Sequence, residues 1–115
     1  MTNDKTFDLE DRTTQYGIRV ISFCKGVVLN PIIQPLVVQL VRSSTSIGAN
    51  YREANGADSK KDFTAKISIC KKEAKETMHW LEIIGSSFSS ETVQARILWK
   101  EAHELSLIFG AINRK

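Results

Sequence analysis

The sequence predicts an all-α protein, folded as an antiparallel, up-down-up-down four-helix bundle. Apolar residues recur at alternating three- and four-residue steps in four segments, which is typical of helices that pack nearly parallel to one another. Short polar connections join the segments, so consecutive helices should run in opposite directions. With 115 residues, 42% of them hydrophobic and 25% charged, the chain has the composition of one soluble domain spanning residues 1–115.

The first helix is predicted from Leu9 to Leu29. Acidic residues near its start suit the positive end of the helix dipole. The Asn30-Pro31 pair should end it, because the residue before a proline avoids helical geometry. Its inward positions, read from the spacing, are Leu9, Thr13, Tyr16, Val20, Phe23 and Val27.

The second helix is predicted from Pro35 to Ala54, since a proline is well placed in a first turn. Residues 43–48 are rich in serine, threonine and glycine, which are mediocre to poor helix formers. The apolar spacing nevertheless continues through them, so we predict helix with Gly48 at a close approach to a neighbouring helix; the alternative is a loop. The inward positions are Val37, Leu40, Val41, Ser44, Ile47, Gly48 and Tyr51.

The third helix, from Ser59 to Gly85, has the clearest periodicity in the chain. Ser59 with Asp62 three residues later predicts a capped first turn, and Gly85 predicts a stop. Positions on a single seam alternate by four and three residues, as a bundle helix requires. They are Phe63, Ile67, Cys70, Ala74, Thr77, Leu81 and Ile84.

Two other faces of the third helix differ in chemistry. A helix of a monomeric bundle needs one apolar stripe, so an additional apolar flank favours an interface with a second copy of the chain. The alternative is a wide stripe covered by two helices of the same chain. The opposite face carries lysines, which we predict to contact nucleic-acid phosphates. The flank comprises Ala65, Ile69, Glu73, Glu76, Trp80 and Ile83, and the lysine face comprises Lys60, Lys61, Lys71, Lys72 and Lys75.

The two glutamates of the flank need a cation or hydrogen-bond donors if they are covered. Arg42 and Arg52 of the second helix are the expected partners of Glu73 and Glu76. The alternative is that both carboxylates reach solvent. No aromatic stacking platform or recognition motif is evident, so nucleic-acid binding should be largely independent of sequence.

The fourth helix should open at Ser89 or Ser90 with Glu91 and continue to the C-terminus. No stretch is apolar enough for a membrane span. The polar N-terminal residues 1–12 carry no secretion signal, so we expect a cytoplasmic protein. The inward positions of the fourth helix are Leu98, Ala102, Leu105, Phe109 and Ile112.

Motifs for catalysis and metal binding are weak. Glu76 and His79 form a Glu-x-x-His pair, but di-iron bundles need a second such pair and further carboxylates. There is no nucleophile elbow and no phosphate loop. We therefore predict no metal, no cofactor and no enzyme activity. Cys24 and Cys70 lie among apolar residues and should be buried and reduced.

Several stretches resemble a known family. They are FDLEDRT near the start, the segment from NPIIQP at residue 30 to EII at residue 84, and ELSLIFGAINRK at the end. The most specific part is SIGANYREA, Ser46 to Ala54, followed by KKEAKETMHWL, Lys71 to Leu81. These stretches are similar to the bacterial four helix bundle protein family, also called the 23S rRNA intervening-sequence protein family.

The resemblance implies a left-handed antiparallel bundle that assembles as a ring-shaped homo-oligomer, typically a pentamer. A related branch, the accessory variability-determinant protein of diversity-generating retroelements, is a basic pentamer that binds nucleic acid and a reverse transcriptase. Self-association, RNA or DNA, and a reverse transcriptase are therefore the partners it suggests, although the formal net charge of +3 is lower than in that branch. We predict a non-enzymatic oligomer that binds nucleic acid; the alternatives are a protein-interaction scaffold and a metal-dependent bundle enzyme.

Overall fold

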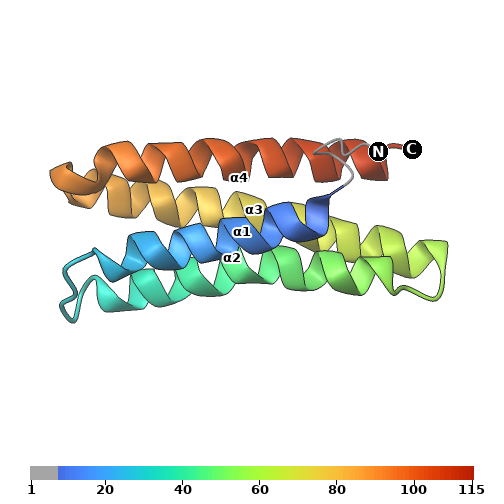
Figure 1. The fold of residues 1–115 in the computed structure, drawn as a ribbon, viewed down its shortest axis with the longest axis horizontal. Helices are drawn as coiled ribbons and strands as arrows, with labels where there is room; N and C mark the ends of the chain where they lie inside the picture. The colour runs from blue at the N-terminus through green and yellow to red at the C-terminus, as the bar shows by residue number, and fades with distance from the viewer. Residues whose placement is uncertain (1–7) are drawn as a thin grey trace.

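The computed structural model describes residues 8–115, which form four long helices joined by short connections (Figure 1). Within that range there is no β-strand, and none of the helices combines the length and the hydropathy of a membrane span. Residues 1–7, part of the polar segment for which we predicted no secretion signal, lie outside the described residues. The elements are α1 (Leu9–Lys25), α2 (Gln34–Asn55), α3 (Lys60–Ser87), a short 3-10 helix η2 (Ser89–Glu91) and α4 (Thr92–Asn113).

Consecutive helices run in opposite directions, as predicted (Figure 1). The longest helix, α3, packs against α2 along one side and α4 along the other. By contrast, α1 packs closely on α2 and makes only a narrow contact with α4. The described residues measure 44 × 29 × 20 Å, an elongated shape that leaves long helical faces open to solvent.

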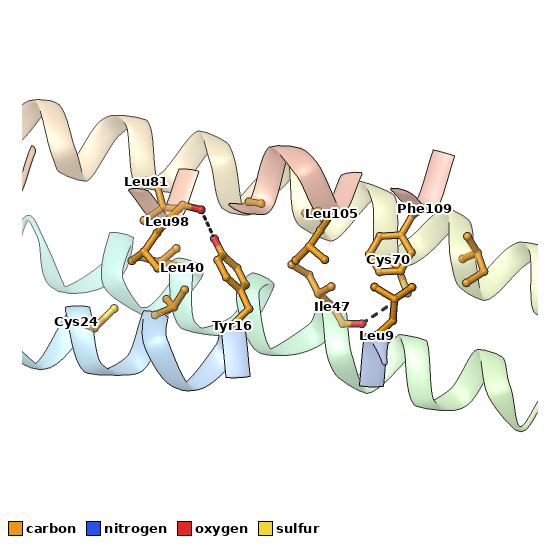
Figure 2. Close-up of a cluster of buried hydrophobic side chains, with 14 of the residues drawn as sticks. Leu9, Tyr16, Cys24, Leu40, Ile47, Cys70, Leu81, Leu98, Leu105 and Phe109 are labelled. Atoms are coloured by element: carbon orange, nitrogen blue, oxygen red, sulfur yellow. Dashed lines mark hydrogen bonds between the residues drawn. The ribbon is translucent and has the colours of Figure 1, made fainter. Parts of the chain in front are cut away.

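The inward positions predicted from spacing form one hydrophobic core that draws on all four helices (Figure 2). Tyr16 is the largest fully buried side chain, and its hydroxyl donates a hydrogen bond to the Leu98 carbonyl at 2.8 Å. At the other end of the core, the Cys70 thiol lies 3.6 Å from the Ile47 carbonyl. Six of the predicted positions lie at the edges and are only partly buried: Phe23, Val37, Val41, Tyr51, Phe63 and Ile112.

Both cysteines are free and buried, as predicted. Burial raises the pKa of Cys24 to about 11 and that of Cys70 to about 12, because an apolar environment disfavours the thiolate. Neither group is therefore a reactive nucleophile near neutral pH.

We expect the free energy of unfolding to fall at alkaline pH. Unfolded thiols, with an ordinary pKa of 9.0, lose their protons before the folded ones as the pH rises. Stability should therefore be lost progressively between about pH 9 and pH 12. Urea denaturation at several pH values measures this slope, and a Cys70→Ala variant should show a shallower one. An identical slope in that variant would assign the alkaline loss to other groups.

The end of α1 differs from the prediction. It ends at Lys25, one turn before the expected Leu29. The Gly26 amide bonds to the Phe23 carbonyl at 3.1 Å, a three-residue step that tightens and ends the helix. Because glycine is a poor helix former, the helix ends at Gly26 and does not continue to the Asn30-Pro31 pair. Val27 still reaches the core from the connection.

The small-residue stretch 43–48 is helical, so the loop alternative is wrong. A Cβ added at Gly48 would lie 3.1 Å from Thr13 Oγ1 of α1, which confirms the predicted close approach. On the opposite side of α2, the buried hydroxyls of Ser43 and Thr77 lie 2.9 Å apart. Small side chains therefore allow α1 and α3 to pack closely on α2, and this packing offsets their low helix propensity.

The predicted stop at Gly85 is also wrong, since α3 continues through it to Ser87. A Cβ at Gly85 would lie only 2.8 Å from the Ala95 Cβ, so this glycine permits close contact with α4. The fourth helix begins at Thr92, after η2 and later than predicted, and the Thr92 hydroxyl donates to the Gly85 carbonyl at 2.8 Å.

The predicted cap of α3 is confirmed: the Ser59 hydroxyl accepts from the Asp62 amide at 3.0 Å.

Candidate nucleic-acid interface

The predicted lysine face is a single exposed surface of α3. Between residues 60 and 75 the acidic side chains of α3 are engaged elsewhere, because Asp62 lies 4.0 Å from Lys66, and Glu73 pairs with Arg42 of α2. Glu82 is the first carboxylate on the lysine face itself. The exposed cations of the face are Lys60, Lys61, Lys71, Lys72 and Lys75.

A groove with a volume of about 590 Å³ separates this face from the end of α4. Gly110 of α4 leaves room for two long side chains. A Cβ at that glycine would lie 3.5 Å from Arg114 Nη1 and 3.6 Å from Lys71 Nζ. Two cations from different helices thus converge over one glycine. The lining residues are Ser68, Lys71, Lys72, Lys75, Gly110, Asn113 and Arg114.

Asn113 fixes the end of α4 against α3. Its side-chain amide donates to the Thr64 carbonyl at 3.1 Å and to the Ser68 hydroxyl at 2.9 Å. Arg114 is consequently held beside Lys71. Arg114 was not predicted from the sequence, because only the antiparallel packing of α4 on α3 brings residues 71 and 114 together. The sequence does contain one signal for it: Gly110 and Arg114 are four residues apart, which places them on the same face of a helix.

The groove cations lack carboxylate partners within residues 8–115. The ion pairs of that range involve Arg12, Arg42, Arg52 and Lys66. None involves the cations that line the groove. Like charges held close together repel one another, and a bound anion would relieve that repulsion. The end of α4 is also the negative end of its dipole, which offsets part of the repulsion.

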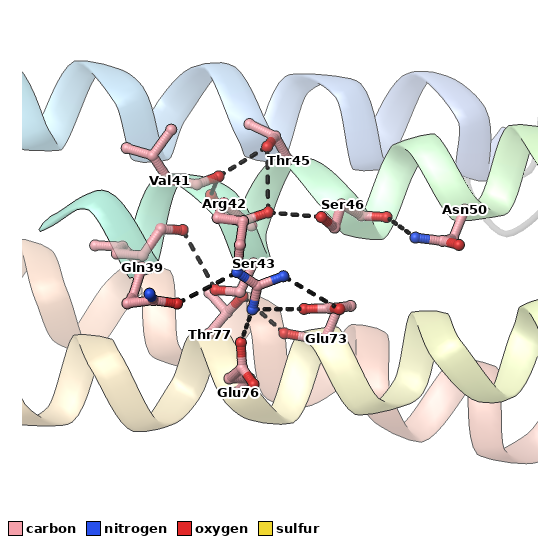
Figure 3. Close-up of polar contacts among 12 residues, drawn as sticks. Gln39, Val41, Arg42, Ser43, Thr45, Ser46, Asn50, Glu73, Glu76 and Thr77 are labelled. Carbon is pink, nitrogen blue, oxygen red and sulfur yellow. Dashed lines mark hydrogen bonds and ion pairs between the residues drawn. The ribbon is translucent and has the colours of Figure 1, made fainter. Parts of the chain in front are cut away.

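The glutamates of the α3 flank meet Arg42, as predicted (Figure 3). Arg42 Nη2 lies 3.3 Å from Glu73 Oε1 and also contacts Glu76 Oε1. The prediction for Arg52 is wrong, since that residue pairs at 3.3 Å with Glu10 of α1. Arg52 lies further along α2, where α1 supplies a closer carboxylate. Because the Arg42 side chain is 46% exposed, solvent screens its pairs and their contribution to stability is modest.

The apolar members of the flank are only partly covered by their own chain. Ile69 is 36% exposed, while Trp80 and Ile83 are half-buried. The Trp80 indole Nε1 is buried, yet it has no hydrogen-bond partner among the described residues. An unpaired buried donor costs free energy, so this position does not favour the stability of the fold.

The Glu-x-x-His pair does not converge on a common point. Glu76 contacts Arg42, whereas the His79 ring packs edge-on against Trp80 with centroids 5.0 Å apart. Within residues 8–115, no three His, Cys, Asp or Glu side chains are grouped closely enough to hold a metal ion.

Comparison with known proteins connects this architecture to a family. The family model described as 23S rRNA-intervening sequence protein matches residues 33–111, which include α2, α3 and most of α4. A crystal structure from Bacteroides thetaiotaomicron, described as a protein with unknown function from the S23 ribosomal protein family, is similar with a TM-score of 0.83. Its sequence identity is 31%, over 92% of this chain and 98% of that chain. No curated protein matches the chain.

Proposed function

The chain belongs to the 23S rRNA-intervening sequence protein family, and from that premise we propose that it is a non-enzymatic, self-associating bundle that binds RNA or DNA. The observation that carries the proposal is the run of exposed lysines on α3, which form no ion pair within residues 8–115 and are continued across the groove by Arg114. The family description mentions 23S ribosomal RNA, and the description of the similar crystal structure mentions a ribosomal protein family. RNA is therefore the first ligand to test.

Phosphate contacts would supply the affinity. Lys60 and Lys61 lie in the first turn of α3, where the positive end of the helix dipole adds to their field. Lys71, Lys75 and Arg114 continue the positive surface along the groove. Such contacts release counterions, so the logarithm of the affinity should fall linearly with the logarithm of the salt concentration.

Self-association would repeat the cationic surface in every subunit. The incompletely covered flank of α3, with Ile69, Trp80 and Ile83, supports it, because a second copy would bury these side chains. Further exposed apolar side chains, which were not predicted from the sequence, lie on α1 and on the connection after it. There Ile18 is 53% exposed and Ile32 is 79% exposed. We propose a ring-shaped pentamer, the number that the family resemblance implies.

The binding proposal is tested by titrating labelled RNA and duplex DNA at several salt concentrations. Lys71→Glu combined with Lys75→Glu should weaken binding and flatten the salt dependence. The matched control, Arg19→Glu with Lys25→Glu on α1, changes the net charge equally and should retain more affinity. If the parent does not bind at low salt, or both variants lose affinity equally, the lysine face is ordinary solvated surface and the scaffold alternative takes its place.

Light scattering coupled to size exclusion tests self-association. A pentamer should have five times the chain mass of 12.9 kDa. Replacing Ile69 and Ile83 by lysine should shift the protein to smaller species while it stays helical. A monomeric parent at micromolar concentration would contradict the proposal.

A further inference from the structure

A second hollow, with a volume of about 400 Å³, lies between α3 and α4. It is separate from the groove lined by Lys71 and Arg114, hereafter the Arg114 groove. Its floor is made by the buried residues Leu81, Gly85 and Ala95. The hollow exists because neither Gly85 nor Ala95 has a side chain long enough to fill the space above their contact. Most of the surface that faces the hollow is apolar. The other residues that line it are Glu82, Ser86, Thr92, Arg96, Trp99 and Lys100.

Trp99 supplies an aromatic wall to this hollow. The side chain is half-buried on α4, and its ring is 5.2 Å from the His103 ring with an interplanar angle of 31°. This stacking restricts the indole to a defined orientation. No aromatic stacking platform was predicted from the sequence, and Trp99 was not singled out there. Only the packing of α4 against Gly85 creates space beside the indole.

Cations flank the aromatic wall. Arg96 and Lys100, one turn apart on α4, line the same hollow. Neither belongs to an ion pair within residues 8–115. On the α3 wall, Glu82 offers a carboxylate acceptor and Ser86 a hydroxyl. The hollow therefore combines a flat apolar surface with polar groups and, at its rim, positive charge.

We propose that this hollow, hereafter the Trp99 pocket, binds an unpaired base of single-stranded RNA or DNA. The base stacks on Trp99, its edge faces Glu82 and Ser86, and the neighbouring phosphates contact Arg96 and Lys100. Stacking on an aromatic side chain tolerates any base, because every base has a π-face. The inference rests on the proposed nucleic-acid function and specifies the form of nucleic acid that is bound.

The pocket and the Arg114 groove lie along the same boundary between α3 and α4. From Lys75 of the groove to Glu82 of the pocket the helix advances by about 10 Å. One strand can therefore contact the cations of the groove and place a base in the pocket. A paired duplex cannot do so without unstacking a base, at a cost of about a few kcal/mol. Single strands should consequently bind more tightly than duplexes.

Tryptophan fluorescence provides a direct test. The chain has two tryptophans, so a Trp80→Phe variant reports on Trp99 alone. A single-stranded oligonucleotide and adenosine monophosphate should both quench this signal, whereas a blunt duplex of the same sequence should leave it unchanged. In the otherwise native protein, Trp99→Leu should weaken single-strand binding by about 5- to 150-fold and leave duplex binding unaltered.

A second variant covers the case in which Trp99→Leu does not fold. Ser86 is exposed at the wall of the pocket, so Ser86→Leu should fill the space without disturbing the core and should produce the same loss. If single strands bind but neither quench Trp99 nor respond to Ser86→Leu, the pocket is overturned and the lysine-face function stands. If single strand, duplex and mononucleotide all fail to bind, both proposals are overturned.

Discussion

Replacing Tyr16 by alanine should lower the free energy of unfolding by about 3–5 kcal/mol, the usual range for removing a buried aromatic side chain. Tyr16 is only 1% exposed and reaches from α1 across the core to the Leu98 carbonyl of α4. Because α1 otherwise makes a narrow contact with α4, few neighbouring side chains can move in to fill the cavity. Arg12 of α1 also crosses this boundary, pairing with Glu101 at 2.8 Å and with Glu104.

Tyr16→Phe is the matched control, since it keeps the ring and removes only the hydroxyl. It should cost about 0.5–1.5 kcal/mol, the net value of one hydrogen bond. Urea denaturation at one fixed protein concentration measures both variants, because self-association would otherwise shift the apparent stability. An alanine variant as stable as the phenylalanine variant would show that α1 does not pack on the core as described.

Gly48→Leu should destabilise the protein by about 1–3 kcal/mol or more, although a leucine would strengthen an isolated helix. The nearest atoms to an added Cβ are Thr13 Oγ1 at 3.1 Å, Thr13 Cβ at 3.4 Å and the Thr13 backbone carbonyl carbon at 3.5 Å. The backbone cannot move aside without displacing α1. A leucine therefore forces α1 and α2 apart along the whole pair.

At a second helical glycine, a substitution should raise the free energy of unfolding instead of lowering it. At Gly17 an added Cβ would lie 3.6 Å from Thr45 Cγ2, an ordinary contact distance. Gly17→Ala should therefore keep the packing and gain up to about 1 kcal/mol from helix propensity. Thermal denaturation of the two variants compares them directly. If Gly48→Leu is as stable as the parent, the described contact between α1 and α2 is incorrect.

The sequence alone determined the features that depend on residues close together in the chain. The three- and four-residue spacing identified all four helices and most of the inward side chains, because a helix repeats its faces every 3.6 residues. The Ser59 cap and the exposed lysine face of α3 followed from the same local geometry. By contrast, the sequence offered Arg42, Arg52 or solvent for Glu73, and the packing of α2 on α3 decided for Arg42.

Only the tertiary structure decided the features that join distant residues. Gly85 reads as a helix stop in the sequence, but contact with Ala95 makes it a point of close packing inside α3. Arg114 joins Lys71, and Trp99 gains an open pocket, because α4 runs antiparallel to α3 at a particular register. Helical periodicity specifies which face of each helix turns inward but not how far one helix slides along another. The positions where side chains from α3 and α4 meet were therefore beyond the reach of the sequence.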